Sequence, residues 1–453
     1  MINNQALEVI LDTRKSVLAA HTGKTLDILL RLRARSENTE PVRTPLALAL
    51  VIDRSGSMTG RKLREAKRCV LDLVKRLHDD DCFSVTAYDQ VPQEIMSLVR
   101  VREARPLLQQ ALSEIEAGGS TALFDGWLMG AKSLEDQDLL EINPLTQNAL
   151  KRVILLTDGQ ANVGLMAIEP ICEQVKEYAK RGISTTTVGF GIDFNEELLT
   201  AMANSGQGNA WYGERVEDLA ESFDAEMSYL SNVLWKDVRV ALVTPLSNAL
   251  EEVKVRNDYA QTGRREWSLP AIAANSEVWM AISLEMNRVI QMQTTDTVLT
   301  CQIRAKNKDG LEHEFSISLP KLPVVEMAEY RAAPENELVA RRFNEVESAD
   351  IQRQARAYVQ DRNWTAVERL INQLQERATD NPWLMETVSY LRKLLEQRDH
   401  VMMGKELAYA SQSLRNRASS LSETAFYSAS QESFKPAYLR RKVVKGRNSE
   451  SQS

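Results

Sequence analysis

A run of seven apolar residues, Leu46–Ile52, limits the possible folds of this chain more than any other feature of its sequence. A strand that is buried on both faces looks like this, as in a parallel sheet with helices on both sides. Three further strand-like segments follow at 82–88, 153–156 and 183–188, and segments with helical apolar spacing separate them. Such alternation is typical of βαβ units, so we expect a doubly wound, mostly parallel α/β sheet over residues 44–227.

The segments before and after this α/β region show the alternation of half-buried strands instead. Apolar side chains occupy every second position from Leu26 to Leu32, which predicts a strand with one buried and one solvent-exposed face. Residues 228–328 alternate in the same way and contain Asp309-Gly310, a hairpin signal. Because two strands are marginal alone, we expect residues 1–43 to join an antiparallel β-sandwich formed by 228–328. The α/β domain is then an insertion in that sandwich.

The C-terminal part of the chain is helical in pattern. One helix is expected over 336–360, and apolar stripes at 367–374 and 384–395 flank a break at Asn381-Pro382. We therefore interpret residues 329–423 as a helical region that contains an antiparallel hairpin, and we interpret Met402-Met403-Gly404 as a loop or helix end. The remaining residues, 424–453, are rich in serine and carry six basic against two acidic residues, which predicts a flexible basic tail.

Composition excludes several classes of protein. The chain has 56 Lys and Arg against 63 Asp and Glu, a net charge of −7, which argues against a broad nucleic-acid surface. Its four cysteines share no CxxC spacing, so neither a common zinc site nor a disulfide framework is expected. No segment has the length and apolarity of a membrane span, and residues 1–10 do not have a signal peptide's pattern. Free thiols then predict a reducing compartment, the cytoplasm.

Three short polar pieces belong to the predicted α/β domain. Asp53-Arg54-Ser55-Gly56-Ser57 follows the first buried strand directly, and Thr157-Asp158-Gly159 follows a later one. Gly118-Gly119-Ser120-Thr121 lies just before an expected helix. The carboxyl ends of parallel strands lie at one edge of the sheet, where ligand sites form. We therefore expect these pieces to converge at that edge.

These residues offer only oxygen atoms, which favour Mg²⁺, with Mn²⁺ or Ca²⁺ as alternatives. Ser55, Ser57 and Thr121 are expected to be neutral direct ligands, while Asp53 and Asp158 hold waters and orient the hydroxyls. An ion bound by neutral ligands keeps much of its positive charge. We expect its open position to take an Asp or Glu carboxylate from a protein partner.

The same five residues match the metal-ion-dependent adhesion site of von Willebrand factor A domains: DxSxS, then a Thr, then an Asp in a TDG-like segment. The resemblance covers residues 44–227 and implies the fold, divalent-cation binding and protein–protein interaction. The surrounding arrangement also resembles bacterial proteins that set such a domain beside a β-sandwich. That second resemblance rests on architecture rather than on residues.

A non-enzymatic interaction module is the function that these features favour. One alternative is an accessory subunit of an ATPase or chelatase-type complex, with the ATPase on a separate chain because no P-loop is present. Another is a metal-dependent hydrolase, although the motif pieces contain no His or Lys as a general base. Arg54 either contacts a charged group of the partner or is a solvated side chain. Asp125 is expected to be an exposed carboxylate at a helix start. No pattern in the sequence predicts the identity of the partner or the oligomeric state.

Overall fold

The computed structural model describes most of the chain, namely residues 7–20, 25–35, 43–135, 142, 148–158, 161–190, 194–213, 223, 226–244, 250–286, 297–378, 381–416 and 419–420. The chain divides into two compact units. One consists mainly of Glu40–Val233, and the other combines Met1–Thr39 with Leu234–Asn307 and Leu311–Lys435.

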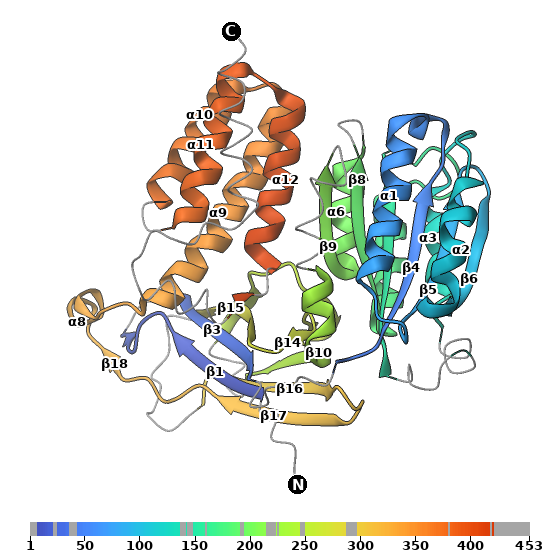
Figure 1. The fold of residues 1–453 in the computed structure, drawn as a ribbon. Helices are drawn as coiled ribbons and strands as arrows, with labels where there is room; N and C mark the ends of the chain where they lie inside the picture. Colours follow the sequence, from blue (N-terminus) through green and yellow to red (C-terminus); the bar gives the residue numbers. More distant parts are fainter. Residues whose placement is uncertain are drawn as a thin grey trace. The chain divides into compact units, whose positions relative to one another are not determined.

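A six-stranded sheet forms the centre of the first unit (Figure 1). Its strands, in spatial order, are β6 (Pro92–Arg100), β5 (Cys82–Tyr88), β4 (Leu46–Asp53), β7 (Leu150–Thr157), β8 (Ile183–Phe190) and β9 (Gln207–Gly213). Neighbouring strands are parallel except for β6, which pairs antiparallel with β5. The predicted doubly wound, mostly parallel sheet is confirmed, and β6 and β9 are strands that the sequence pattern did not predict.

Helices cover both faces of this sheet, which explains the apolar run in β4. Among the residues that the structure describes, the helical elements of this unit are η1 (Gly56–Met58), α1 (Arg61–Arg76), α2 (Val101–Ser113), α3 (Leu123–Lys132), α5 (Ile168–Lys180) and α6 (Glu196–Ser205). Leu48 and Leu50 belong to one core with the apolar stripe of α1, while Val51 points at Gly130 of α3. A Cβ at Gly130 would lie 2.4 Å from a methyl of Val51, so the close approach of α3 requires glycine there.

Two antiparallel sheets form the β part of the second unit. One has the order β1 (Leu7–Thr13), β3 (Thr25–Ala34), β15 (Ser276–Met286) and β11 (Leu250–Val255), and the other has the order β12 (Ala260–Gly263), β13 (Glu266–Ser268), β10 (Val233–Val243), β16 (Thr300–Asn307) and β17 (Glu312–Ser318). Two short strands complete them, namely β14 (Ile272–Ala273) beside β10 and β19 (Ser419–Ser420) beside β15. A separate two-stranded parallel sheet is formed by β2 (Leu18–Ala19) and β18 (Val324–Val325). The inner faces of the two sheets share one apolar core.

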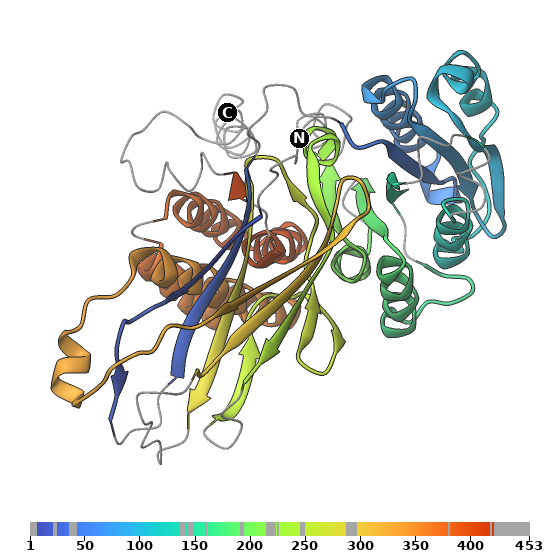
Figure 2. The same cartoon turned by 90° about the horizontal axis from the view of Figure 1, so that it is seen from below.

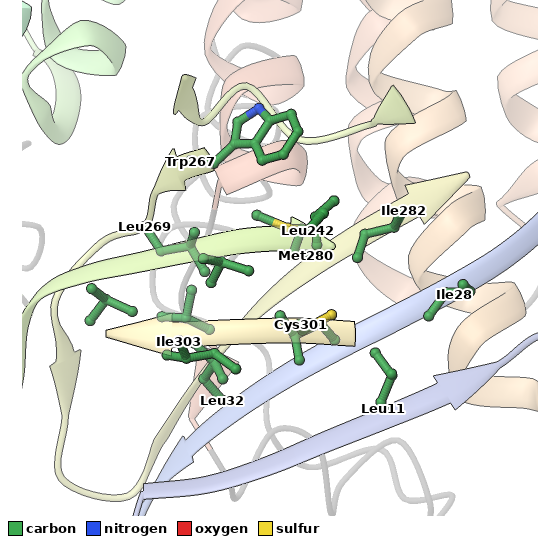
Figure 3. Packing of buried hydrophobic residues seen from close by; sticks show 14 of the residues in the cluster. Leu11, Ile28, Leu32, Leu242, Trp267, Leu269, Met280, Ile282, Cys301 and Ile303 are labelled. Carbon is green, nitrogen blue, oxygen red and sulfur yellow. The ribbon is translucent and has the colours of Figure 1, made fainter. Parts of the chain in front are cut away.

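Strand β3 pairs with β15 in the first of these sheets, although the α/β domain lies between the two strands in sequence. It pairs with β15 over its whole length, from Thr25 opposite Glu285 to Ala34 opposite Ser276. Figure 3 shows Ile28 and Leu32 of β3 in one cluster with Cys301 and Ile303 of β16. The predicted insertion of the α/β domain between two parts of a β domain is therefore present, while the exact boundaries stay predictions.

The outer face of β3 is not exposed to solvent, so that part of the sequence prediction is wrong. Leu29 of β3 and Trp279 of β15 are buried against Val339, Phe343 and Val346. Those three residues belong to α9 (Glu337–Gln360), which packs on this face. A helix more than 300 residues further along the chain thus covers the face that alternation assigns to water.

Helix α9 forms a bundle with three later helices, α10 (Trp364–Arg377), α11 (Pro382–Gln397) and α12 (His400–Asn416), and the short α8 (Met327–Ala332) precedes it. Figure 2 shows the bundle nearly end-on beside the sheets of its unit. The side chains of Asn336, Asn363 and Asn381 accept hydrogen bonds from backbone N–H groups at the starts of α9, α10 and α11. Met402-Met403-Gly404 lies at the N-terminal end of α12, so the interpretation as a helix end is confirmed, whereas a loop is excluded there; Met403 is buried.

Candidate metal centre

The predicted site lies at the carboxyl edge of the six-stranded sheet. Asp53 is the last residue of β4, and Asp158 follows the last residue of β7. These two strands are parallel neighbours, and the chain order reverses between them because β4 is followed by β5 on its other side. Crevices at such reversal points are where open α/β sheets bind ligands.

Asp53 organises the loop that follows β4. Its side chain is fully buried; Oδ1 accepts a hydrogen bond from the backbone N–H of Ser55 at 2.8 Å, and Oδ2 accepts one from Thr157 Oγ1 at 2.6 Å. Burial raises the pKa of Asp53, while the hydrogen bonds from Thr157 and Ser55 act to lower it. The carboxylate thus joins the ends of β4 and β7 and fixes the direction of the loop.

The two serines and Asp158 form one continuous chain of hydrogen bonds. Ser55 Oγ lies 3.1 Å from Ser57 Oγ, and Ser57 Oγ donates to Asp158 Oδ1 at 2.8 Å. Ser55 and Asp158 are each 1% exposed, whereas Ser57 is exposed at the surface. Lys62 of α1 pairs with Asp158 Oδ2, the other oxygen of the same carboxylate. Three of the predicted oxygen groups therefore meet at one point of the edge.

Backbone hydrogen bonds bring the loop that contains Thr121 to the same edge. Gly118 N–H donates to Arg54 O at 2.8 Å, and Gly56 N–H donates to Gly119 O at 3.1 Å. Gly119 has φ +72°, a conformation that favours glycine. Thr121 is 3% exposed, and its N–H donates to Asn162 Oδ1 at 2.7 Å, so its backbone is tied to the segment after β7 as well.

The donor set fits a hard divalent cation. Hydroxyl and carboxylate oxygens gather here, the carboxylates of Asp53 and Asp158 are almost completely buried, and Lys62 pairs with Asp158. In the described part of the chain no group of three or more His, Cys, Asp and Glu residues is arranged to hold a metal. A centre in this domain would therefore rely on the serine and threonine hydroxyls, as Mg²⁺ with its retained waters allows.

Several residues around the site have defined partners. Arg54 is 20% exposed in its side chain and contacts Asp89 Oδ2 at 3.3 Å and Gln93 Oε1 at 3.1 Å, so it is tied to the loop after β5 and to the start of β6. Asp125 is exposed in the first turn of α3, as expected. Lys62, which no sequence motif predicted at this site, lies in the first turn of the helix that follows the DxSxS loop.

Comparisons with known proteins identify the domain that carries this edge. The family model of the von Willebrand factor type A domain matches residues 47–225. An uncharacterized protein of Synechocystis sp. is 27% identical over 269 residues, which cover 55% of this chain and 60% of that protein. Inter-alpha-trypsin inhibitor heavy chain H4 of Homo sapiens is 28% identical over 224 residues, which cover 47% of this chain and 23% of that protein. The chain thus spans less than two thirds of either relative.

Solved structures share the fold well beyond the α/β unit. A von Willebrand factor type A protein from Catenulispora acidiphila aligns over 90% of this chain and 98% of its own, with a TM-score of 0.72 and 18% identity. The ArnB paralog VWA2 from Sulfolobus acidocaldarius aligns over the same shares with a TM-score of 0.61 and 15% identity. At these identities the likeness concerns the fold alone. Together with the family match and the strand order, it shows that the chain contains a von Willebrand factor type A domain over residues 47–225.

Proposed function

We propose that this protein binds a protein partner through a divalent cation at the carboxyl edge of its α/β sheet. Ser55, Ser57 and Thr121 would hold the ion directly, and Asp53 and Asp158 would orient these hydroxyls and the ion's waters. The observation that carries the proposal is the hydrogen-bonded chain from Ser55 through Ser57 to Asp158. Mg²⁺ is the expected ion, with Mn²⁺ and Ca²⁺ as alternatives.

The chemistry of this donor set suits binding rather than turnover. Neutral hydroxyl ligands leave the ion with most of its charge, so an Asp or Glu carboxylate of the partner gains a strong contact in an open position. Von Willebrand factor type A domains generally serve protein interaction, which supports a non-enzymatic role. Large apolar side chains also stand on loops tied to the Thr121 segment: Val91 is 63% exposed and Met166 is 53% exposed. Such side chains add contact area for a protein ligand.

The proposal also includes the cytoplasm as the cellular compartment and an ATPase as one candidate partner. All four cysteines are free thiols, which is consistent with the cytoplasm as a reducing compartment. No helix in the described part of the chain is long and apolar enough to cross a membrane. A partner that is itself an ATPase would make this chain an accessory subunit, and identification of the captured partner decides between the two roles.

The test is affinity capture with the tagged full-length chain, followed by mass spectrometry. Capture is compared in Mg²⁺ and in EDTA, and between the parent chain and Ser57→Ala. Ser57 is a better target than Asp53, because Ser57 is exposed whereas Asp53 is buried and bonded to Ser55 and Thr157. Thr59→Ala is the matched control: Thr59 is exposed on the same loop, and its hydroxyl donates to Gly56 O.

We expect a partner that is retained in Mg²⁺ by the parent and by Thr59→Ala, and that is lost in EDTA or with Ser57→Ala. A partner retained equally under all four conditions contradicts the cation-mediated mechanism. A Mg²⁺-dependent turnover of phosphate esters by the purified chain, abolished by Ser57→Ala, would favour the hydrolase alternative instead.

A further inference from the structure

Lys62 is positioned to compete with a cation for one carboxylate of the candidate site. Helix α1 begins at Arg61, directly after Gly60 with φ +81°, and Lys62 is the second residue of the helix. The ammonium pairs with Asp158 Oδ2, while Ser57 occupies Oδ1 of the same carboxylate. The Asp158 side chain is 0% exposed, whereas that of Lys62 is 31% exposed. The lysine therefore approaches the carboxylate from the solvent side.

The charges of the site are unevenly compensated. Asp53 receives hydrogen bonds from neutral donors, the Ser55 N–H and the Thr157 hydroxyl. Asp158 receives the positive charge of Lys62. Counting Asp53, Asp158 and Lys62 with their usual charges gives −1, and removal of the lysine charge gives −2. A divalent cation would bring these totals to +1 and 0, respectively.

We propose that Lys62 is an internal counter-ion that weakens divalent-cation binding at this site and keeps the loaded site positively charged for an acidic partner. The inference rests on the proposed function. A fixed positive charge a few ångströms from a divalent ion repels it, and Lys62 also engages an oxygen that would otherwise orient a ligand of the ion. The flexible, partly exposed stem of lysine allows the ammonium to move aside when the ion enters. The same positive charge attracts the carboxylate that the partner supplies.

The first experiment titrates the purified full-length chain with MgCl₂ and with MnCl₂ in an isothermal calorimeter. The variants are Lys62→Met, which removes the charge but keeps the length of the stem, and Lys62→Arg, which keeps the charge. Arg61→Met is the matched control, because it removes one positive charge from the same turn of α1 at an exposed position. Far-ultraviolet circular dichroism verifies that each variant is folded, and Lys62→Gln replaces Lys62→Met if that variant does not fold.

We expect Lys62→Met to lower the Kd for the ion by about tenfold, and Lys62→Arg and Arg61→Met to stay within about twofold of the parent. An unchanged or higher Kd for Lys62→Met, with clear binding by the parent, overturns this inference and leaves the proposed function standing. Binding by Lys62→Met alone supports the competition and contradicts the proposed function of the unaltered chain. Absence of binding by every variant overturns both.

A second measurement concerns the captured partner. At saturating Mg²⁺, we expect Lys62→Met to bind the partner more weakly than Arg61→Met does, although it binds the ion more tightly. Equal partner affinity for these two variants would contradict the role of the retained charge. This opposite movement of the two affinities distinguishes a specific charge effect from general damage to the site, which would weaken both.

Discussion

Replacement of Ser57 by alanine is expected to change two quantities by different amounts: the free energy of unfolding without metal, and the extra stability that a bound ion provides. Ser57 is exposed, so the substitution leaves no buried cavity and removes one hydroxyl that contacts Ser55 Oγ and Asp158 Oδ1. The acceptor Asp158 Oδ1 belongs to a buried carboxylate, and hydrogen bonds to charged groups contribute about 1.5–3 kcal/mol, which sets the expected loss in the free energy of unfolding without metal. The variant should therefore fold and remain stable enough to assay.

The metal-dependent part of the stability is expected to change as well. An ion present at about 100 times its Kd raises the free energy of unfolding by about 2.7 kcal/mol. Loss of one ligand is expected to raise the Kd at least about tenfold. The same ion concentration is then only about 10 times the Kd of the variant and stabilises it by about 1.4 kcal/mol. The difference of about 1.3 kcal/mol corresponds to about 3–5 °C in Tm for a domain of this size.

Differential scanning calorimetry of the full-length chain, with and without Mg²⁺, measures this difference. For each protein the quantity of interest is the rise in Tm on addition of the ion, so the metal-free cost of the substitution cancels. Thr59→Ala should show the full rise of the parent chain. If Ser57→Ala shows the same rise as the parent, Ser57 is not a ligand. If Mg²⁺, Mn²⁺ and Ca²⁺ leave the Tm of the parent unchanged, the proposed cation site is wrong.

Three further predictions concern other parts of the chain. Burial raises the pKa of Asp27, so the folded state keeps the carboxyl proton to higher pH than the unfolded state does. The stability that this proton contributes is lost as pH rises through the folded pKa. In urea titrations, Asp27→Asn should therefore gain stability relative to the parent between pH 4 and 7, and a constant difference would refute this. Glu277→Ala removes a fully buried carboxylate that pairs with Arg33, and a loss of about 3–5 kcal/mol is expected in the same titrations, whereas a loss below about 1 kcal/mol would contradict the burial. Burial raises the pKa of Cys82 to about 11 and that of Cys301 to about 12, so both should react slowly with Ellman's reagent at pH 8 until urea is added; rapid reaction in the native protein would contradict this.

The central sheet and its polar edge could be predicted because their signals are local. The run Leu46–Ile52 is apolar on both faces, and the DxSxS segment follows it without a gap, so strand and ligand loop are adjacent in sequence as well as in space. The edge strand Pro92–Arg100 carries no such signal, because most of its side chains are partly or fully exposed and no buried face imposes a period of two. Sequence patterns therefore identify the buried strands of a sheet better than its edges.

Lys62 could not be identified in the same way. A lysine in the first turn of an amphipathic helix is an ordinary surface residue by its pattern, and α1 has five further basic residues, Arg61, Arg64, Lys67, Arg68 and Lys75, before its last residue Arg76. What singles Lys62 out is its ion pair with Asp158, which depends on the rotation of α1 relative to the loop. That rotation depends on how the apolar stripe of α1 packs on the sheet, and this is a property of the tertiary structure rather than of the motif.

The covered outer face of β3 shows why charged residues can mislead a prediction of exposure. Arg31 and Arg33 share that face with Leu29, and alternation with arginine is the usual mark of a strand face in water. In the structure Arg31 is only 9% exposed, and both arginines lie within ion-pair distance of Glu277, which is fully buried on β15. Arg31 also pairs with Asp12 of β1 at 2.8 Å, but the carboxylate that both arginines share is 244 residues from Arg33 in sequence, beyond the inserted domain. A charged side chain can be buried when it is paired, and here the pairing carboxylate is distant in sequence. In the isolated strand the two arginines therefore indicate a solvent-exposed face. In the folded protein the same face is covered by α9.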